Sequence, residues 1–222
     1  MAKFLNDISI YPYYTEEAKK WSYSTNFLEY LYLDSLPKVE TNGVAKVLIK
    51  PCKALPEQPL QLKQRKPDIY QFSKLFDFDL YFESDKEARK RMALDFLQGG
   101  ILEVARIRGW DTKPFVAAYE TVLEKNFVYY HPWSKLVLSP DRKHKAQVWC
   151  DFDSDKAGIY IVFFHRKEIV TRALVTTIKP GGVWIRQTIG NLEWVSSNSV
   201  KLSSKDGKQS WEASVETPPP AR

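Results

Sequence analysis

The first third of the chain alternates runs of aromatic and β-branched residues with proline-bearing connections. Three runs, residues 4–14, 44–51 and 69–82, have the composition of strands, because such side chains suit a pleated, half-buried surface. Residues 51–67 hold four prolines and follow neither a helical nor a strand period, which favours an extended surface connection. We therefore predict a mixed β region with a proline-rich connection over residues 1–83.

The helical period begins after this region. Ser84 and Glu87 have the spacing of a capping box, in which a hydroxyl and a carboxylate satisfy the first free amides of a helix. Apolar positions then recur near every 3.6 residues, and Gly109 is a natural C-terminal cap. Gly99 and Gly100 are costly inside a helix, so we expect a close backbone approach or a kink there.

A second helix is predicted directly after the first. It begins at Asp111 or Thr112, with Pro114 in its first turn, where the missing proline N–H costs nothing. Residues 84–126 are thus expected to form an αα-hairpin. Trp110, in its short turn, is interpreted as a packing residue rather than a ligand-binding one.

From residue 127 onward the pattern changes to short strands joined by polar turns. The expected strands are 136–138, 146–152, 159–164, 169–177, 183–189, 191–195, 200–203 and 209–213. This pattern predicts an antiparallel meander over 127–215 that packs with the helices as one compact unit, followed by a disordered tail, 216–222. Trp149, Trp194 and Trp211 are expected to share one sheet face. The fold class is α+β.

Composition and cysteine use favour a protein of the cytoplasm. The 222 residues are 44% hydrophobic and 27% charged, close to the average for globular proteins. The N-terminus has no signal-peptide pattern, and no apolar run is long enough to cross a membrane. Cys52 and Cys150 form no C-x-x-C pair, so we interpret both as buried apolar residues in a reducing compartment.

The excess of positive charge is thin and lies in the C-terminal part of the chain. The net charge is +6, and residues 127–222 hold 14 Lys and Arg against 9 Asp and Glu. Basic loops meeting at neighbouring hairpin ends would form a surface for phosphate or for an acidic partner, and otherwise they are solvated turns. The candidate partner-binding residues are Arg142, Lys143, His144, Lys145, Arg166, Lys167 and Trp133.

Metal and cofactor motifs do not assemble from the sequence. The stretch Asp151 to Asp155 has the alternating oxygen ligands that begin a calcium loop, but Lys156 and Val162 replace the required glycine and glutamate. We find no nucleophile-elbow, phosphate-loop or dinucleotide-binding motif. We therefore expect no metal and no cofactor, and a solvated hairpin turn at Asp151 to Asp155.

Catalysis would require acids and histidines that only folding brings together. His131, His144 and His165 lack metal-ligand spacing. A hydrolase is conceivable if His131 or His165 met Asp77, Asp79 or Glu83 in one cleft. We expect instead that the histidines lie on separate elements, that Asp77 and Asp79 face solvent on a strand, and that the protein is not an enzyme.

The order of elements resembles a class of bacterial proteins. A β region is followed by a helical hairpin containing Gly109-Trp110-Asp111, and then by a meander with Leu192-Glu193-Trp194-Val195-Ser196 and Ser204-Lys205-Asp206-Gly207. Over residues 84–215 this order is similar to that of immunity proteins encoded beside polymorphic toxins. The resemblance carries over no functional residue.

The resemblance implies a non-enzymatic inhibitor that binds one cognate toxin domain. Because nuclease inhibitors tend to be acidic, this basic chain suits an acidic or neutral partner better. The leading hypothesis is thus a cytoplasmic protein-binding module, with no membrane partner. Nucleic-acid binding through the basic C-terminal loops is the alternative, and a hydrolase is the third.

Overall fold

The chain forms two compact units, which are described separately. The computed structural model describes residues 4–10, 16–55 and 69–216, so the predicted tail at 216–222, apart from Glu216, and most of the 51–67 connection lie outside the described residues. The N-terminal unit is Met1–Phe127 and the C-terminal unit is Val128–Arg222. This boundary places the helical hairpin with the preceding residues, whereas the sequence suggested that it packs with the meander.

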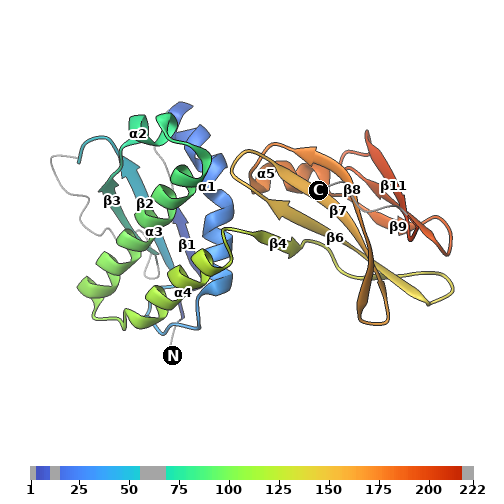
Figure 1. Cartoon of the computed structure of the whole chain (residues 1–222). Coiled ribbons are helices and arrows are strands. Elements are labelled where there is room, and N and C mark those ends of the chain that lie inside the picture. Colours follow the sequence, from blue (N-terminus) through green and yellow to red (C-terminus); the bar gives the residue numbers. More distant parts are fainter. Residues whose placement is uncertain (1–3, 11–15, 56–68, 217–222) are drawn as a thin grey trace. The chain divides into compact units, whose positions relative to one another are not determined.

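The N-terminal unit contains a three-stranded parallel sheet with the order β1-β2-β3 (Figure 1). Its elements are β1 (Asp7–Ile10), α1 (Glu16–Ser35), β2 (Lys46–Cys52), β3 (Ile69–Leu75), α2 (Phe78–Glu83), α3 (Lys86–Arg108) and α4 (Lys113–Glu124). Parallel neighbours need a crossover, and α1 supplies the one between β1 and β2. The chain is α+β, with the predicted αα-hairpin formed by α3 and α4.

A group of aromatic rings around Trp21 forms much of the core of the N-terminal unit. Trp21, on α1, is fully buried. Its ring centroid lies 4.9 Å from that of Phe76, 6.0 Å from Phe78 and 5.7 Å from Phe96. These rings come from α1, α2, α3 and the segment after β3, and aromatic pairs at such distances contribute beyond their buried area. These rings therefore join α1, α2 and α3 to the segment that follows β3.

Helix α1 was not predicted from the sequence. Its segment holds an aromatic or aliphatic residue on most of its faces, and Trp21, Leu28, Leu31 and Tyr32 are fully buried. A helix covered on several sides loses the clean amphipathic stripe on which sequence recognition depends. Glu16 and Glu17 stand in its first turn, where negative charge is favourable.

Two predicted boundaries in this unit need correction. The strand expected over 69–82 ends at Leu75, because Asp77 accepts a hydrogen bond from the Leu80 N–H (2.9 Å) and begins α2. Asp85, not Ser84, caps α3 by accepting from the Ala88 N–H (2.9 Å).

The end of α3 and its double glycine follow the predictions. Gly109 ends the helix in the left-handed conformation, with φ of 67°. The helix is continuous through Gly99 and Gly100, and Gly100 allows close approach to Ile49 on β2. Trp110 is buried, with its ring 6.5 Å from that of Phe115, as expected of a packing residue.

The C-terminal unit contains two antiparallel sheets. The larger has five strands, ordered β4-β6-β7-β8 with β5 also paired to β6, and the smaller has the order β11-β10-β9 (Figure 1). The elements are β4 (Tyr129–Pro132), β5 (Val137–Leu138), β6 (His144–Phe152), β7 (Ala157–His165), β8 (Glu168–Ile178), α5 (Gly182–Thr188), β9 (Leu192–Trp194), β10 (Ser199–Ser203) and β11 (Ser210–Ser214). The predicted meander is thus present, except that the strand expected at 183–189 is the short helix α5.

One face of the five-stranded sheet forms the core of the C-terminal unit. Strand residues alternate between faces, and the inner positions are fully or nearly fully buried: Ala146, Val148, Cys150, Phe152, Ala157, Ile159, Ile161 and Phe163. The Phe163 ring lies 5.8 Å from that of Trp194 on β9, so the smaller sheet packs on this side. Trp149 is on the larger sheet, whereas Trp194 and Trp211 are on the smaller one, so the three do not share a sheet face.

Within the described ranges, no helix has the length and apolar character needed to cross a membrane.

The two neighbouring glycines of α3 give a matched test of the packing against β2. A Cβ added at Gly100 would lie 2.7 Å from Cδ1 of the fully buried Ile49, whereas one at Gly99 would lie 3.3 Å from the flexible end of Lys74. Gly100→Ala should lower the free energy of unfolding by roughly 1–3 kcal/mol through overpacking.

Gly99→Ala is the control, since both variants share the gain of about 1 kcal/mol in helix propensity. It should be neutral or stabilising. Urea denaturation, followed through the Trp21 indole resonance, compares the two. Equal stability of both variants would show that Gly100 is not needed for the approach to Ile49.

Candidate functional site

The outer face of the five-stranded sheet is the most distinctive surface of the C-terminal unit. Its side chains form rows across the strands, as the register of β6, β7 and β8 defines. The first row, nearest the turn that joins β7 to β8, holds Lys145 with Phe164. The second row holds Gln147 with Val162 and Arg172, and the third holds Trp149 with Tyr160 and Leu174. The last row, nearest the turn that joins β6 to β7, holds Asp151 with Gly158. Large aromatic and basic side chains therefore occupy a face that the smaller sheet does not cover.

Four outer residues form what we call the aromatic cluster: Tyr130, which lies on β4 opposite Asp151, and Trp149, Tyr160 and Arg172. The Tyr130 ring centroid lies 4.7 Å from that of Trp149 and 5.6 Å from that of Tyr160. The Arg172 guanidinium carbon lies 5.4 Å from the Tyr130 centroid, within cation–π range. The three rings are partly exposed and Arg172 is exposed, so the cluster is ordered by its own contacts while still accessible.

Polar neighbours fix the central ring of the cluster. The Trp149 indole N–H donates to Oε1 of Gln147 (2.9 Å), and the Gln147 amide donates to the Ser134 carbonyl (2.7 Å). The indole orientation is therefore held before any partner arrives.

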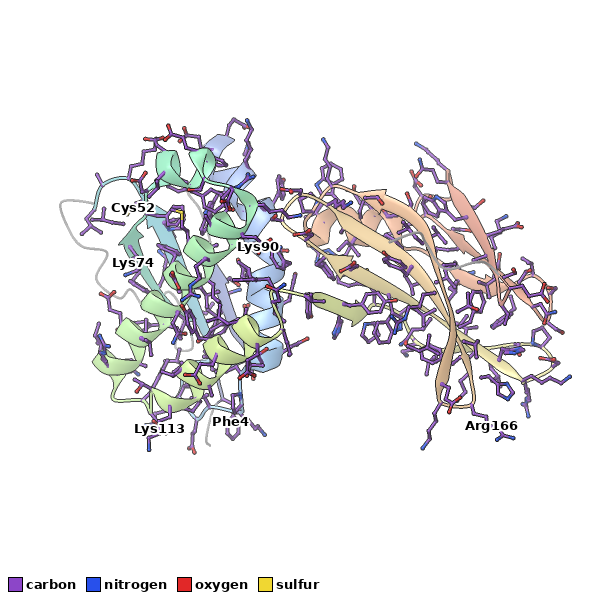
Figure 2. All side chains as sticks on the ribbon, viewed as in Figure 1. Phe4, Cys52, Lys74, Lys90, Lys113 and Arg166 are labelled. Atoms are coloured by element: carbon purple, nitrogen blue, oxygen red, sulfur yellow. The ribbon has the colours of Figure 1, made fainter. Side chains whose placement is uncertain are left out.

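Two hairpin turns bring the predicted basic residues together. We call them the basic turns: residues 142–145, which lead into β6, and Arg166 with Lys167, between β7 and β8. His144 and His165 are register partners, with ring centroids 5.6 Å apart, so the two turns lie side by side. Arg166 lies at the tip of the β7–β8 hairpin (Figure 2). Lys145 belongs both to the first basic turn and to the first outer row, so the basic turns continue into the outer face.

The hydrogen bonds within the first basic turn are structural. Asp141 accepts from the Ser139 hydroxyl (2.7 Å) and the Lys143 N–H (3.2 Å), and these bonds hold the pKa of its carboxyl below the usual range. The same Ser-x-Asp-x-Lys arrangement recurs at Ser204, where Asp206 accepts from that hydroxyl (2.7 Å) and from the Lys208 N–H (3.1 Å). Because both turns have the same hydrogen bonds, these bonds are explained by turn formation alone. Only its side chains that face solvent are candidates for binding.

Trp133 does not join the basic turns. Its backbone N–H donates to the Val148 carbonyl (2.8 Å), and its ring lies 6.1 Å from that of Phe152, a residue of the buried inner face. The predicted binding set therefore separates into the basic turns and a half-buried packing residue. The aromatic cluster was missed by the sequence search, although the alternation around Trp149 and Tyr160 was a usable signal.

The predicted acids and histidines fall in different units. Asp77 and Asp79 are exposed, as expected, but they begin helix α2 instead of lying on a strand, and Asp79 pairs with Lys53 at 3.0 Å. The histidines lie on separate strands of the C-terminal unit. His131 stacks on Tyr129 at 5.3 Å.

Metal ligands do not gather in the part of the chain that the structure describes, where no three His, Cys, Asp or Glu side chains are grouped to hold an ion. The stretch Asp151 to Asp155 is a hairpin turn between β6 and β7, as predicted. Asp153 closes this turn by accepting from the Ser154 N–H (2.7 Å).

A second candidate lies in the N-terminal unit around a buried carboxyl. Glu29, on α1, accepts from the Ile10 N–H (2.9 Å) and from the Asn26 amide (3.4 Å). It lines a cavity of about 530 Å³ together with Asp7 and Lys46, which form an ion pair with each other. Desolvation by burial raises the pKa of Glu29 to about 8, against the opposing hydrogen bond from Ile10. The polar groups of this cavity are largely satisfied by one another, so it gives a weaker indication of a ligand than the aromatic cluster does.

Comparison with protein-family models, with curated proteins and with solved structures finds no match to this chain. The functional argument therefore rests on the residues of the chain itself.

The buried Glu29 predicts an unusual pH dependence of stability for the N-terminal unit. Its pKa is higher in the folded state, about 8, than the ordinary value of 4.5, so folding favours the protonated form. Its contribution is fully present below about pH 4.5, declines as the pH rises, and is lost above about pH 8. The total change should be on the order of 3–5 kcal/mol.

Glu29→Gln removes this ionisation and retains an oxygen that accepts from the Ile10 N–H. Urea denaturation across this pH range, followed through the Trp21 indole, should show a shallower decline for Glu29→Gln than for the unchanged chain. Glu103→Gln, at an exposed position of α3, should retain the steep decline. Identical pH profiles for all three proteins would contradict a protonated Glu29.

Proposed function

We propose that the chain is a non-enzymatic protein-binding module of the immunity type, which neutralises one cognate toxin domain by direct binding in the cytoplasm. The observation that carries this proposal is the aromatic cluster on the outer sheet face. Tryptophan, tyrosine and arginine are the residue types most enriched among those that dominate binding energy at protein interfaces. Here all three types meet in one ordered and partly exposed group.

The order within the cluster supports recognition of a folded partner. Held by the Gln147 hydrogen bond and by ring contacts, Trp149 loses little conformational freedom on binding. Preorganisation of this kind lowers the entropic cost of association. The free, buried thiols of Cys52 and Cys150 support a reducing compartment as the site of action.

Nucleic-acid binding is the second candidate, and the basic turns favour it. Phosphate contacts release counterions, so such binding must weaken steeply with added salt. Retention of a labelled single-stranded oligonucleotide by the purified chain at low salt, lost at high salt, would support this alternative. Its absence at low salt would eliminate it.

Removing the central ring of the cluster should weaken capture of the partner. The chain is co-expressed with each toxin-like protein found to be encoded beside its gene, and complex formation and protection of growth are both scored. Trp149→Ala should weaken the complex by at least about thirtyfold, the loss of roughly 2 kcal/mol expected at an interface anchor.

Trp184→Ala is the matched control, because Trp184 is an exposed tryptophan of the same unit on α5. It should bind and protect as the unchanged chain does, and Arg172→Ala serves as a second cluster variant if Trp149→Ala unfolds. Full protection by both cluster variants, or no protection by the unchanged chain, would refute the proposal.

A further inference from the structure

We infer that the aromatic cluster and the basic turns form one composite docking surface for an acidic protein segment. The segment would place an apolar side chain over Trp149 and Tyr160 and carboxylates against Arg172 and Lys145. This inference rests on the proposed function and specifies the chemistry of the partner. It follows from the charges of the outer face and from which of them have an ion-pair partner.

The cations of this surface lack carboxylate partners. Across the described residues, no Asp or Glu lies within ion-pair distance of Arg142, Lys145, Arg166, Lys167 or Arg172. Some basic residues elsewhere are paired, as Arg91 is with Asp95 at 3.1 Å. These five cations lie in the outer rows and in the basic turns beside the exposed rings, so the surface has charge available for a partner.

Three acids lie near this charge. Glu168 follows Lys167 and pairs in register with His165, and within the described residues it forms no ion pair with the cations of the basic turns. Asp141 is engaged by the hydrogen bonds of its own turn, and its nearest cation is Lys143 at 3.8 Å. Asp151 lies in the row farthest from the basic turns, and burial raises the pKa of its carboxyl. The surface therefore has a direction, with its positive end at the basic turns and its apolar centre at Trp149 and Tyr160.

This charge distribution favours an acidic protein segment over the other occupants. A second copy of the chain would bring like charges together, which opposes association. Nucleic acids stack their bases on separated aromatic faces, whereas Tyr130 and Tyr160 meet edge to face at 89° and are partly covered by each other.

The inference is tested with a capped peptide, Glu-Leu-Glu-Phe-Glu-Leu-Glu, added to the isotope-labelled full chain. The indole N–H resonance of Trp149 reports binding, because this group lies within the surface and donates to Gln147. The peptide should shift the Trp149 resonance and leave that of Trp184 in place. Arg172→Glu should weaken binding by about tenfold through charge reversal. Lys208→Glu, which reverses a charge in the equivalent turn of the smaller sheet, should leave affinity within about twofold because Lys208 lies in the turn between β10 and β11 and not on the outer face.

Three comparisons complete the test: a lysine peptide, the chain alone and a single-stranded oligonucleotide. A matching peptide with lysine in place of glutamate should not shift the Trp149 resonance, and the chain alone should show no concentration-dependent shift. Failure of the acidic peptide, equal binding of the lysine peptide, self-association through this resonance, or tighter binding of a single-stranded oligonucleotide would each overturn the inference. Peptide binding without capture of the toxin-like protein would refute the proposed function alone, whereas capture without peptide binding would refute the acidic-segment inference alone.

Discussion

One-sided burial of the five-stranded sheet is the constraint on which the C-terminal unit depends. The inner positions of β6 and β7 are filled by small and branched apolar residues, and the smaller sheet packs against them through contacts such as Phe163 with Trp194. Because strand side chains alternate, the register that buries this set also fixes which residues face outward. Shifting the register by one residue would bury Trp149 and expose Val148. The core and the candidate binding surface are therefore two consequences of the same pairing.

The N-terminal unit is stabilised differently, by a cluster of aromatic rings around Trp21 and by helices that cover a small parallel sheet. It also contains a costly feature, since the Glu29 carboxyl is buried with a backbone N–H and an amide as its donors. Burial without a cation in direct contact favours the neutral acid. A group kept protonated in this way makes the stability of the folded state depend on pH. This dependence belongs to the N-terminal unit, whereas the proposed binding surface lies on the C-terminal unit.

The sequence predicts the fold best where local signals act alone. The helix from residue 86 to 108, its glycine cap and the hairpins of the meander depend on short-range capping and turn chemistry, and they appear close to the predicted residues. Helix α1 was missed because its apolar residues surround much of the helix. Residues 183–189 have β-branched composition, yet they form α5 after Gly181, whose φ of 115° favours glycine.

The candidate site was predicted in part. The basic turns could be identified because their charges are adjacent in sequence, and their proximity followed from the expected hairpins. The aromatic cluster joins residues from β4, β6, β7 and β8, so it depends on the order and register of four strands, which periodicity does not give. Trp133 was included for its residue type, but its ring lies near the buried Phe152.

The central claim is that the outer face of the five-stranded sheet meets a protein partner. Hydrogen–deuterium exchange of the full chain, alone and in complex with a captured partner, tests it most directly. The account predicts added protection in the stretches that form this face: 142–149, 160–167 and 172–174. Protection confined to the N-terminal unit, or to β9, β10 and β11, would contradict it.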